Sequence, residues 1–409
     1  MIHYLRAVKK LRNKYLSIVI MRGNKMIRRF SVRNYKNFEK TLVLDLGKVG
    51  GYKFNVECIE NDTITKCLLY GRNATGKTNL GEALTDIWGI IFLRPYKFRN
   101  DRILNANSDE KTATFSYEFI FGNDKVDYEY QRNMKQDLVT EKLIINGDIV
   151  FDMNFEQGAF FDINLALVDA DTIQVDKYLE TVKHTLVEME DEDNLQVPFL
   201  RYILNNAPLM PHSVLNKLED FVKRMRISIV SSSIMQKNRL NMGFNEYLAE
   251  ADNLKKFQDF LNDMGIECDL DVVKSVDGKY ELFFKHKSLI PFYENASSGT
   301  LTLVTFYRRM LAGDRKPSLF YMDEFDAFYN YEISEKIVRY LKKNFPNSQI
   351  ILTTHNTNLM TNHLMRPDCL FILSRTGKIT ALCDATEREL REGHNLEKLY
   401  IGGEFEQYE

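Results

Sequence analysis

Residues 71–78 read Gly-Arg-Asn-Ala-Thr-Gly-Lys-Thr, which has the residue types and spacing of a phosphate-binding loop. The segment matches the pattern G-x-x-x-x-G-K-[ST], and it lies between an apolar run typical of a strand and a helical pattern. Backbone N–H groups of such a loop point towards phosphate oxygens, and the next helix presents the positive end of its dipole to them. We therefore expect Lys77 to bridge the β- and γ-phosphates of a nucleotide and Thr78 to offer its hydroxyl to Mg²⁺.

Two adjacent carboxylates, Asp323 and Glu324, follow the apolar run at residues 318–322. The carboxyl end of a strand in a parallel sheet faces the crevice where ligands bind, so these side chains are expected beside the phosphate-binding loop. Asp323 could hold the Mg²⁺ shell while Glu324 polarises the attacking water. An acidic strand end alone is a weak signal, but combined with the upstream loop it predicts hydrolysis of a nucleoside triphosphate.

Two further polar segments flank the carboxylates. Ser297, Ser298 and Gly299 open a predicted helix about 25 residues before them, and His355 ends a buried strand pattern about 30 residues after them. Taken singly, the first segment is more typical of a helix cap and the second of an ordinary strand end. Their order and spacing around the acidic strand favour a shared role in the nucleotide site.

Together these segments resemble the ABC-type ATPase heads of the SMC, RecF and OLD-like (overcoming lysogenisation defect) AAA proteins. In this resemblance residues 71–78 are the Walker A motif, 296–300 the signature motif, 319–324 the Walker B motif and 353–355 the histidine switch. The resemblance covers roughly residues 26–403 and matches only loosely over 150–290. Two other segments contribute to it: residues 28–38 are similar to the opening strand and aromatic loop of the family, and 395–403 to the ending of stand-alone OLD-like ATPases.

The resemblance implies an ATP- and Mg²⁺-dependent ATPase whose heads pair face to face around the nucleotide. Ser298 and Gly299 of one head would reach the γ-phosphate bound by Lys77 of the other, and His355 would sense that phosphate. The implied catalytic residues are Glu324, Lys77 and His355, and the implied Mg²⁺ ligands are Thr78 and Asp323. The implied nucleotide-binding residues are Gly71, Arg72, Asn73, Ala74, Thr75, Gly76, Lys77, Thr78, Asn79, Ser297, Ser298 and Gly299.

Some positions of the family pattern stay open. Asn330 falls where the family has a dimer-contacting loop that often carries Asp or His, so at this position the chain departs from the family pattern. The family's Mg²⁺-contacting glutamine is not identifiable, and Gln174 and Gln196 are only candidates. Tyr35 and Lys36 are candidates for a place near the base or sugar.

The elements that must position these residues follow from hydrophobic periodicity and turn residues. Alternating strands and helices in the C-terminal part predict an α/β fold, an ABC-type head with a mainly parallel core sheet, an antiparallel β subdomain and a helical insertion. The strand patterns fall at residues 28–32, 41–45, 112–121, 126–132, 143–151, 281–285, 318–322, 349–353 and 369–373. The helical patterns fall at residues 77–92, 175–190, 198–206, 213–226, 245–264, 300–311, 334–344 and 357–364.

The chain is predicted to divide into four parts. These are a basic N-terminal extension at residues 1–25, an N-terminal ATPase lobe with the antiparallel subdomain at 26–163, a mainly helical insertion at 164–280, and a C-terminal ATPase lobe at 281–409. The first 25 residues carry seven Lys or Arg side chains and no acidic one. The favoured interpretation is an extension upstream of the first domain, and a basic arm touching an anionic surface is the alternative. A sustained heptad pattern is missing, which excludes long coiled-coil arms.

The composition limits the function classes. With 409 residues, 44% of them hydrophobic, and a formal net charge of −2, the chain is typical of a globular protein without a basic bias towards nucleic acid. Five cysteines without a C-x-x-C pair argue against a zinc site or a disulfide framework and fit a reducing cytoplasm. No apolar run reaches the ~18–20 residues of a membrane span.

Three functions remain. The first is a stand-alone OLD-like ATPase that senses a trigger and controls a separately encoded nuclease or toxin, as the resemblance suggests for bacterial antiphage modules. The second is a RecF-like ATPase in DNA repair, although Asp323-Glu324 is not the double-Asp Walker B typical of RecF. The third is a nucleotide-gated scaffold with slow hydrolysis. A transporter subunit fits poorly, because the signature motif follows Walker A by far more than the usual hundred or so residues. A TOPRIM nuclease domain in the same chain is not expected either, because too few residues follow His355.

Overall fold

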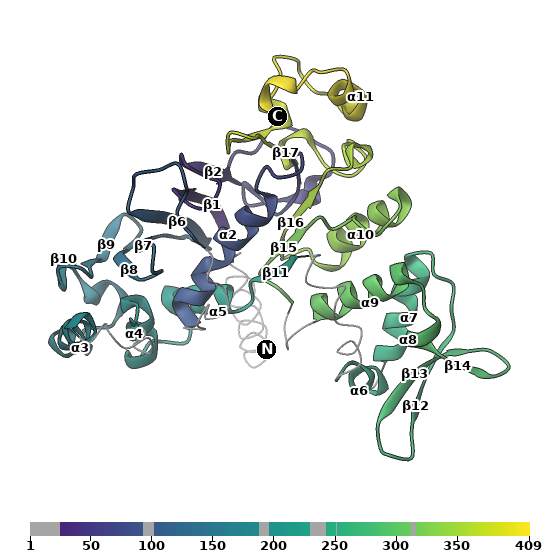
Figure 1. The fold of residues 1–409 in the computed structure, drawn as a ribbon, viewed down its shortest axis with the longest axis horizontal. Helices are drawn as coiled ribbons and strands as arrows, with labels where there is room; N and C mark the ends of the chain where they lie inside the picture. The colour runs from purple at the N-terminus through teal and green to yellow at the C-terminus, as the bar shows by residue number, and fades with distance from the viewer. Residues whose placement is uncertain (1–24, 93–101, 188–195, 230–242, 251, 312–315) are drawn as a thin grey trace, which may run out of the picture.

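The computed structural model describes residues 25–92, 102–187, 196–229, 243–250, 252–311 and 316–409. The predicted extension at 1–25 therefore lies, except for Lys25, outside the described residues. The fold is α/β and contains a six-stranded and a seven-stranded sheet, with helix α2 (Lys77–Phe92) between them (Figure 1). A smaller lobe carries a three-stranded sheet, and two short strands, β3 (Ile59–Glu60) and β4 (Thr63–Ile64), pair with each other.

The six-stranded sheet forms the core and is parallel except for one edge strand. Its order is β11 (Arg226–Ile229), β15 (Leu319–Asp323), β16 (Gln349–Thr354), β5 (Lys66–Tyr70), β17 (Leu370–Leu373) and β18 (Ile379–Ala381). Only β18 runs antiparallel to its neighbour. Every residue of β5, β15, β16 and β17 is buried, as expected of central strands covered on both faces. The predicted mainly parallel core sheet is thus confirmed.

The seven-stranded sheet is antiparallel throughout. Its order is β10 (Ala159–Ile163), β9 (Asp148–Asn154), β8 (Leu138–Ile145), β7 (Asp124–Asn133), β6 (Thr112–Phe121), β1 (Lys25–Arg33) and β2 (Leu42–Asp45). Buried and less buried residues alternate along β6, so one face of the sheet belongs to the core. A turn with positive φ at Asn146 and Gly147 divides the predicted 143–151 segment into two strands.

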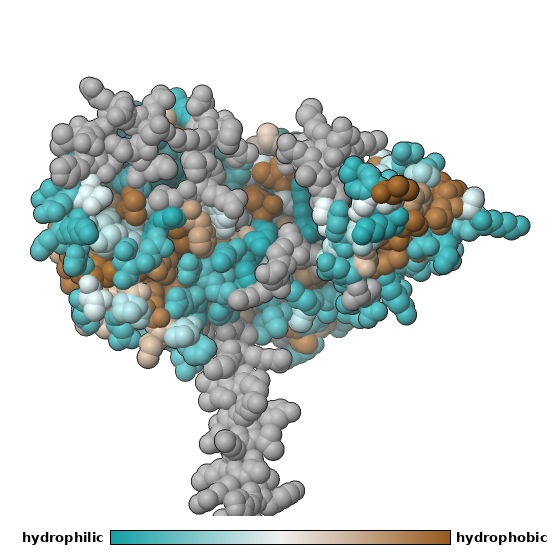
Figure 2. Space-filling view, turned by 90° about the horizontal axis from the view of Figure 1, so that it is seen from below, coloured by the Kyte–Doolittle hydropathy of each residue, from teal (hydrophilic) through white to brown (hydrophobic). Residues whose placement is uncertain are grey.

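The structure describes nine further α-helices, some beside the two large sheets and some in the smaller lobe. They are α3 (Val175–Val187), α4 (Phe199–Asn206), α5 (Val214–Lys223), α6 (Phe244–Ala249), α7 (Asn253–Asp263), α8 (Phe292–Asn295), α9 (Ser298–Leu311), α10 (Tyr331–Asn344) and α11 (Leu396–Ile401). The smaller lobe combines α6–α9 with β12 (Leu270–Lys274), β13 (Tyr280–Lys285) and β14 (Leu289–Pro291) (Figure 1). Aromatic contacts hold it together, among them Phe257 with Tyr307 and Phe260 with Phe306. Hydrophobic side chains also gather on its surface (Figure 2), where Val273, Val276 and Leu289 are exposed.

Helix α2 is fixed to both large sheets, which is what positions the phosphate-binding loop before it. On one side the Tyr321 hydroxyl of β15 donates to the carbonyl of Lys77. A Cβ added at Gly81 would lie 2.4 Å from the Tyr321 ring, so only glycine allows this close approach. On the other side the Tyr117 hydroxyl of β6 donates to the carbonyl of Ala83 at 2.9 Å.

Some predicted elements are wrong. Residues 226–229 form strand β11 of the core sheet, although 226 was assigned to a helix and the rest to none. The strand at 281–285 joins the small antiparallel sheet and not the core. Residues 357–364 contain only the short 3₁₀ helix Thr357–Leu359, and the helix predicted at 245–264 is two helices, α6 and α7. The four domain boundaries stay predictions.

Candidate nucleotide site

The loop at residues 71–78 connects the buried strand β5 to α2, as its motif predicts. Its backbone enters the left-handed region at Ala74 (φ +66°) and at Gly76 (φ +101°). The Thr75 side chain stabilises the turn by donating to the carbonyl of Arg72 at 3.0 Å. Because α2 begins at Lys77, the positive end of a sixteen-residue helix faces the space above the loop.

The Lys77 ammonium lies inside this loop. Its side chain is 4% exposed, and Nζ donates to the carbonyl oxygens of Gly71 at 2.8 Å and Arg72 at 3.3 Å. Burial lowers the pKa of Lys77, while the nearby carboxylates of Glu324, Asp323 and Asp326 oppose that shift. Lys77 Nζ is 4.0 Å from Glu324 Oε1, so the cation and the candidate water-polarising group face the same space.

Asp323 is the centre of a hydrogen-bonded group of oxygens. It is 4% exposed at the carboxyl end of β15, and it accepts from Thr78 Oγ1 at 2.5 Å and from Thr353 Oγ1 at 2.8 Å. Carboxylate and hydroxyl oxygens are hard ligands suited to Mg²⁺, which usually takes one or two carboxylates plus substrate phosphates and waters. Among the described residues no group of three or more His, Cys, Asp or Glu side chains forms a metal site. The fit of Thr78 and Asp323 therefore depends on oxygens that a nucleotide would bring.

Glu324 is held in an unusual backbone conformation. Its φ is +45°, which is uncommon for a residue with a long side chain and is typical of positions over-determined by their surroundings. The Glu324 N–H donates to Thr353 Oγ1 at 2.8 Å, and its side chain is 39% exposed. This carboxylate lies beside Lys77, with its Oε1 4.0 Å from the ammonium nitrogen.

His355 lies at the same edge of the core sheet. Strand β16 pairs with β5 so that Thr354 is opposite Tyr70, the residue before the phosphate-binding loop. His355 follows directly and is exposed. The hydroxyl of Thr354 donates to Asp326 Oδ2 at 2.8 Å and thereby ties the end of β16 to the turn after Glu324. The structure thus brings together Lys77, Thr78, Asp323, Glu324 and the strand end that carries His355.

The signature residues lie apart from this group. Ser297 caps α9, since its hydroxyl accepts from the Thr300 N–H at 3.1 Å, and Ser297 and Ser298 are exposed. A Cβ added at Gly299 would be 3.9 Å from the carbonyl oxygen of Phe328, in the turn after Walker B. In the part of the chain that the structure describes, no hydrogen bond or ion pair joins 297–299 to 71–78.

The open candidates from the sequence have other partners. Asn330 caps α10 by accepting from the Ile333 N–H at 2.9 Å, and Gln196 exchanges two hydrogen bonds with the backbone of Leu138. Tyr35 is only 5% exposed and packs against Phe115, so it is not available to stack on a base. Lys36 pairs with Glu82 of α2 at 2.5 Å. Gln174 is exposed before α3.

Several contacts of the loop were not anticipated from the sequence. Thr353 bridges Asp323 and Glu324, and Asn37 bonds the loop carbonyl of Thr75 at 3.0 Å. The Arg72 guanidinium forms an ion pair with the Glu409 carboxylate, so the C-terminal segment lies against the loop. Each of these contacts joins parts of the chain that are far apart in the sequence. The sequence therefore indicated them only weakly, through a polar residue next to a motif.

A model of the AAA domain family described as "AAA domain, putative AbiEii toxin, Type IV TA system" matches residues 68–361. The chain belongs to this AAA family. The matched range begins in β5 and ends after β16, so it contains the Walker A and Walker B residues and His355. No curated protein matches the chain. No helix among the described residues is long and apolar enough to span a membrane.

Solved structures similar to this AAA family member include Smc heads. An Smc head with an extended coiled coil, derived from Pyrococcus furiosus and bound to the C-terminal domain of ScpA, is 14% identical, with 88% of this chain and 96% of that chain covered and a TM-score of 0.44. The SMC head domain from Thermotoga maritima is 12% identical, with 85% and 94% covered and a TM-score of 0.41. A head from Pyrococcus yayanosii is 13% identical, with 88% and 98% covered and a TM-score of 0.44.

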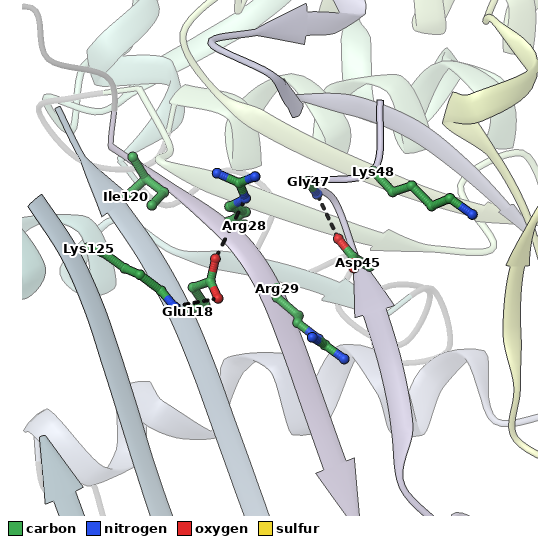
Figure 3. Close-up of a pocket in the computed structure, with 8 residues that line it drawn as sticks. All are labelled: Arg28, Arg29, Asp45, Gly47, Lys48, Glu118, Ile120 and Lys125. Carbon is green, nitrogen blue, oxygen red and sulfur yellow. Dashed lines mark hydrogen bonds and ion pairs between the residues drawn. The ribbon is translucent and has the colours of Figure 1, made fainter. Parts of the chain in front are cut away.

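Apart from the candidate nucleotide site, a hollow lies on the outer face of the antiparallel sheet (Figure 3). Its basic side chains are Arg28, Arg29, Lys48 and Lys125. Three of them have acidic partners: Arg28 and Lys125 lie 3.6 and 3.1 Å from Glu118, and Lys48 lies 2.7 Å from Asp384. Because these charges are largely compensated, the hollow does not form a strongly basic surface for a nucleic-acid backbone.

Proposed function

We propose that this AAA family member binds ATP with Mg²⁺ at residues 71–79 and hydrolyses it. The observation that carries the proposal is the convergence of four side chains from two distant segments: Lys77 and Thr78 at the start of α2, and the carboxylates of Asp323 and Glu324 at the carboxyl end of β15. Thr78 bonds Asp323 at 2.5 Å, and Lys77 is 4.0 Å from Glu324. If Lys77 and Glu324 formed only a structural ion pair, Glu324 would not need a backbone φ of +45° or an exposed carboxylate.

Each residue has a definable task in this reaction. The backbone N–H groups at the start of α2 and the Lys77 ammonium would bind the phosphate oxygens and neutralise the charge that develops on them. Thr78 and Asp323 would hold Mg²⁺, which when bound supplies further charge neutralisation on the phosphates. Glu324 would accept a hydrogen bond from the attacking water and orient it, and His355 would lie near the γ-phosphate.

We further propose that two copies pair around the nucleotide and that the pair controls a separately encoded effector. The exposed signature residues support pairing. The N-terminus of the fourteen-residue helix α9 is suited to a phosphate group, but within the described part of the chain it makes no hydrogen bond to the phosphate-binding loop. The family description names a toxin–antitoxin system, which is consistent with a bacterial defence role in the cytoplasm.

Lys77→Ala tests the assigned ATP site. ATP hydrolysis is expected to fall by roughly 100-fold or more, because a preorganised charge at the γ-phosphate is removed. The matched control is Lys53→Ala, which removes an exposed lysine on the loop between β2 and β3 and should leave the rate unchanged. Undiminished turnover in Lys77→Ala would remove Lys77 from its role. ATP binding without turnover in the unmodified protein would favour the nucleotide-gated scaffold.

Glu324→Gln tests the paired heads. This variant should bind ATP and accumulate as a dimer, because the amide cannot polarise the attacking water and the nucleotide stays intact. Sedimentation velocity with ATP and Mg²⁺ measures the dimer, and Ser298→Arg on the same background should prevent it. If Glu324→Gln binds ATP and still sediments as a monomer, the paired-head mechanism is wrong.

A further inference from the structure

The loop after β1 reaches across the chain to the phosphate-binding loop. Asn37, near its tip, uses both ends of its side-chain amide: Nδ2 donates to the carbonyl oxygen of Thr75 at 3.0 Å, and Oδ1 accepts from Asn79 Nδ2 at 2.6 Å. Thr75 belongs to the phosphate-binding loop and Asn79 to the first turn of α2. A single side chain thus joins the two parts of the site whose backbone N–H groups are expected to surround the phosphates.

Asn37 and Gly76 share one space. A Cβ added at Gly76 would lie 2.4 Å from Asn37 Nδ2 and 2.6 Å from Asn37 Oδ1, which is closer than real contacts allow. The glycine is therefore needed for this close approach as well as for its φ of +101°. Because the amide lies directly on the loop backbone, displacement of Asn37 would also displace the loop.

The segment that presents Asn37 is fixed by its backbone. Tyr35 and Phe38 exchange two backbone hydrogen bonds, at 2.9 and 2.7 Å, and these close the turn around Asn37. Lys36 has φ +48°, donates its N–H to the carbonyl of Ile103 at 2.7 Å and accepts at its own carbonyl from Asn105 Nδ2 at 2.7 Å. The Lys36 ammonium pairs with Glu82, one turn along α2 from Thr78. Asn37 is thus preorganised relative to α2, so little conformational entropy opposes its contacts.

The amide of Asn37 has unused hydrogen-bonding capacity. An Asn side chain has two N–H donors, and only one of the two on Asn37 has a partner among the described residues. Asn37 is exposed and contacts Thr75 and Asn79, whereas the Lys77 ammonium lies against the carbonyl oxygens of Gly71 and Arg72, 4.0 Å from Glu324. Its second N–H is therefore placed to serve an oxygen of a nucleotide on the α-phosphate and sugar side, away from the bond that is cleaved.

We propose that Asn37 is a binding residue of the nucleotide site and that it determines affinity for the α-phosphate and sugar part of ATP and ADP. This inference rests on the proposed ATPase function. An interaction far from the γ-phosphate strengthens binding of substrate and transition state alike, so its loss raises KM without lowering kcat. It also acts on ADP, which lacks the γ-phosphate, to the same extent as on ATP.

The experiment compares Asn37→Ala with Asn37→Asp and with a matched control, Asn206→Ala. Asn206 is an exposed asparagine of α4 whose side chain also donates to a backbone carbonyl, that of Tyr202, at 2.8 Å. For Asn37→Ala we expect KM for ATP and Kd for ADP to rise by a similar factor of roughly ten, with kcat within about twofold. Asn206→Ala should match the unmodified protein in all three constants.

Asn37→Asp separates nucleotide binding from a merely structural role. The carboxylate keeps an acceptor for Asn79 but loses the donor to the Thr75 carbonyl, so it should restore only part of any lost folding stability, measured as Tm. It replaces the proposed N–H donor by a negative charge, so the affinity for ADP should fall below that of Asn37→Ala. If Asn37→Asp instead recovers the affinity of the unmodified protein, Asn37 only supports the loop and the inference is overturned.

The outcomes also distinguish this inference from the function on which it rests. If the unmodified protein neither binds nor hydrolyses ATP, the ATPase proposal fails and this inference fails with it. If the unmodified protein is active, Lys77→Ala is inactive and Asn37→Ala keeps the unmodified KM and Kd, only the role of Asn37 is wrong. A fall in kcat with unchanged KM in Asn37→Ala would likewise contradict it.

Discussion

At the scale of single residues, Thr353 holds the two candidate catalytic carboxylates in register. Its hydroxyl donates to Asp323 Oδ1 at 2.8 Å and accepts from the Glu324 N–H, also at 2.8 Å. One hydroxyl thus donates to Asp323 and accepts from Glu324, which are consecutive residues. Thr353 itself is completely buried in β16, so packing fixes its rotamer. Its hydrogen bonds in turn fix the positions of Asp323 and Glu324.

We predict that Thr353→Val destabilises the protein by roughly 1–3 kcal/mol, because a buried carboxylate oxygen and a backbone N–H lose their partner while the volume is kept. Urea-induced unfolding measures the stability, and ATP turnover should fall together with it, since Glu324 is no longer held at φ +45°. Thr353→Ser retains the hydroxyl and is the control for turnover. Equal turnover in the Val variant and the unmodified protein would show that Thr353 does not orient Glu324.

The residues that carry a motif could be predicted from the sequence, and those that support them could not. Lys77, Thr78, Asp323 and Glu324 lie where strand-end geometry requires them to lie. The sequence singled out Thr353 only as the first residue of the three-residue histidine-switch pattern that ends in His355, and predicted no contact for its side chain. Nothing in the local sequence of Asn37 shows that it would reach Thr75, because that contact depends on how two strands and a helix are packed.

At the scale of elements, a buried carboxylate joins strand β8 to the start of α4. Glu141 accepts from the backbone N–H groups of Phe199 at 2.6 Å and Leu200 at 3.0 Å, and from the Tyr128 hydroxyl at 2.8 Å. The N–H groups at the beginning of a helix lack partners within the helix, and Glu141 satisfies two of them. Burial nevertheless raises the pKa of Glu141 to about 7.

This shift predicts a pH dependence of stability. Between the ordinary value of 4.5 and about 7, the folded protein binds a proton at Glu141 that the unfolded chain does not, so stability falls as the pH rises through this window. Glu141→Gln stays neutral and should gain roughly 3 kcal/mol relative to the unmodified protein between pH 4 and pH 8. Urea unfolding at both pH values measures the change, with the exposed Glu156→Gln as control. If the difference in unfolding free energy between Glu141→Gln and the unmodified protein is the same at pH 4 and pH 8, the raised pKa of Glu141 is contradicted.

Elements with a clear period were predictable, and elements defined by distant partners were not. The helix α2 was predicted with its observed bounds because apolar residues recur at helical spacing and the loop marks its start. Strand β11 has only four residues and directly follows a helix, and its pairing partner β15 lies about ninety residues later. At residues 357–364 the Asn356 side chain accepts from the Asn358 N–H, which favours a single 3₁₀ turn over a longer helix.

At the scale of the whole molecule, α2 connects the core sheet to the antiparallel sheet. Its contact with Tyr321 faces the core sheet, and its contacts with Tyr117 and Arg132 face the antiparallel sheet. Asp86 of α2 accepts from Arg132 Nη1 at 2.6 Å and from the Tyr130 hydroxyl at 2.7 Å. The mainly parallel core could be predicted from the order of elements, but this junction could not, because it joins residues from different sheets.

The buried pair between Arg132 and Asp86 gives the last prediction. Their side chains are 7% and 8% exposed, so removing one partner leaves a charge without compensation in the interior. Arg132→Met should cost about 3–5 kcal/mol, and the double variant Arg132→Met with Asp86→Leu should recover much of it, because an apolar pair replaces an ion pair at little cost. Urea unfolding of the four proteins in this cycle gives the coupling energy. If the single and double variants are equally unstable, the loss comes from the other contacts of Arg132, such as that with the Gln136 carbonyl, and not from the buried charge.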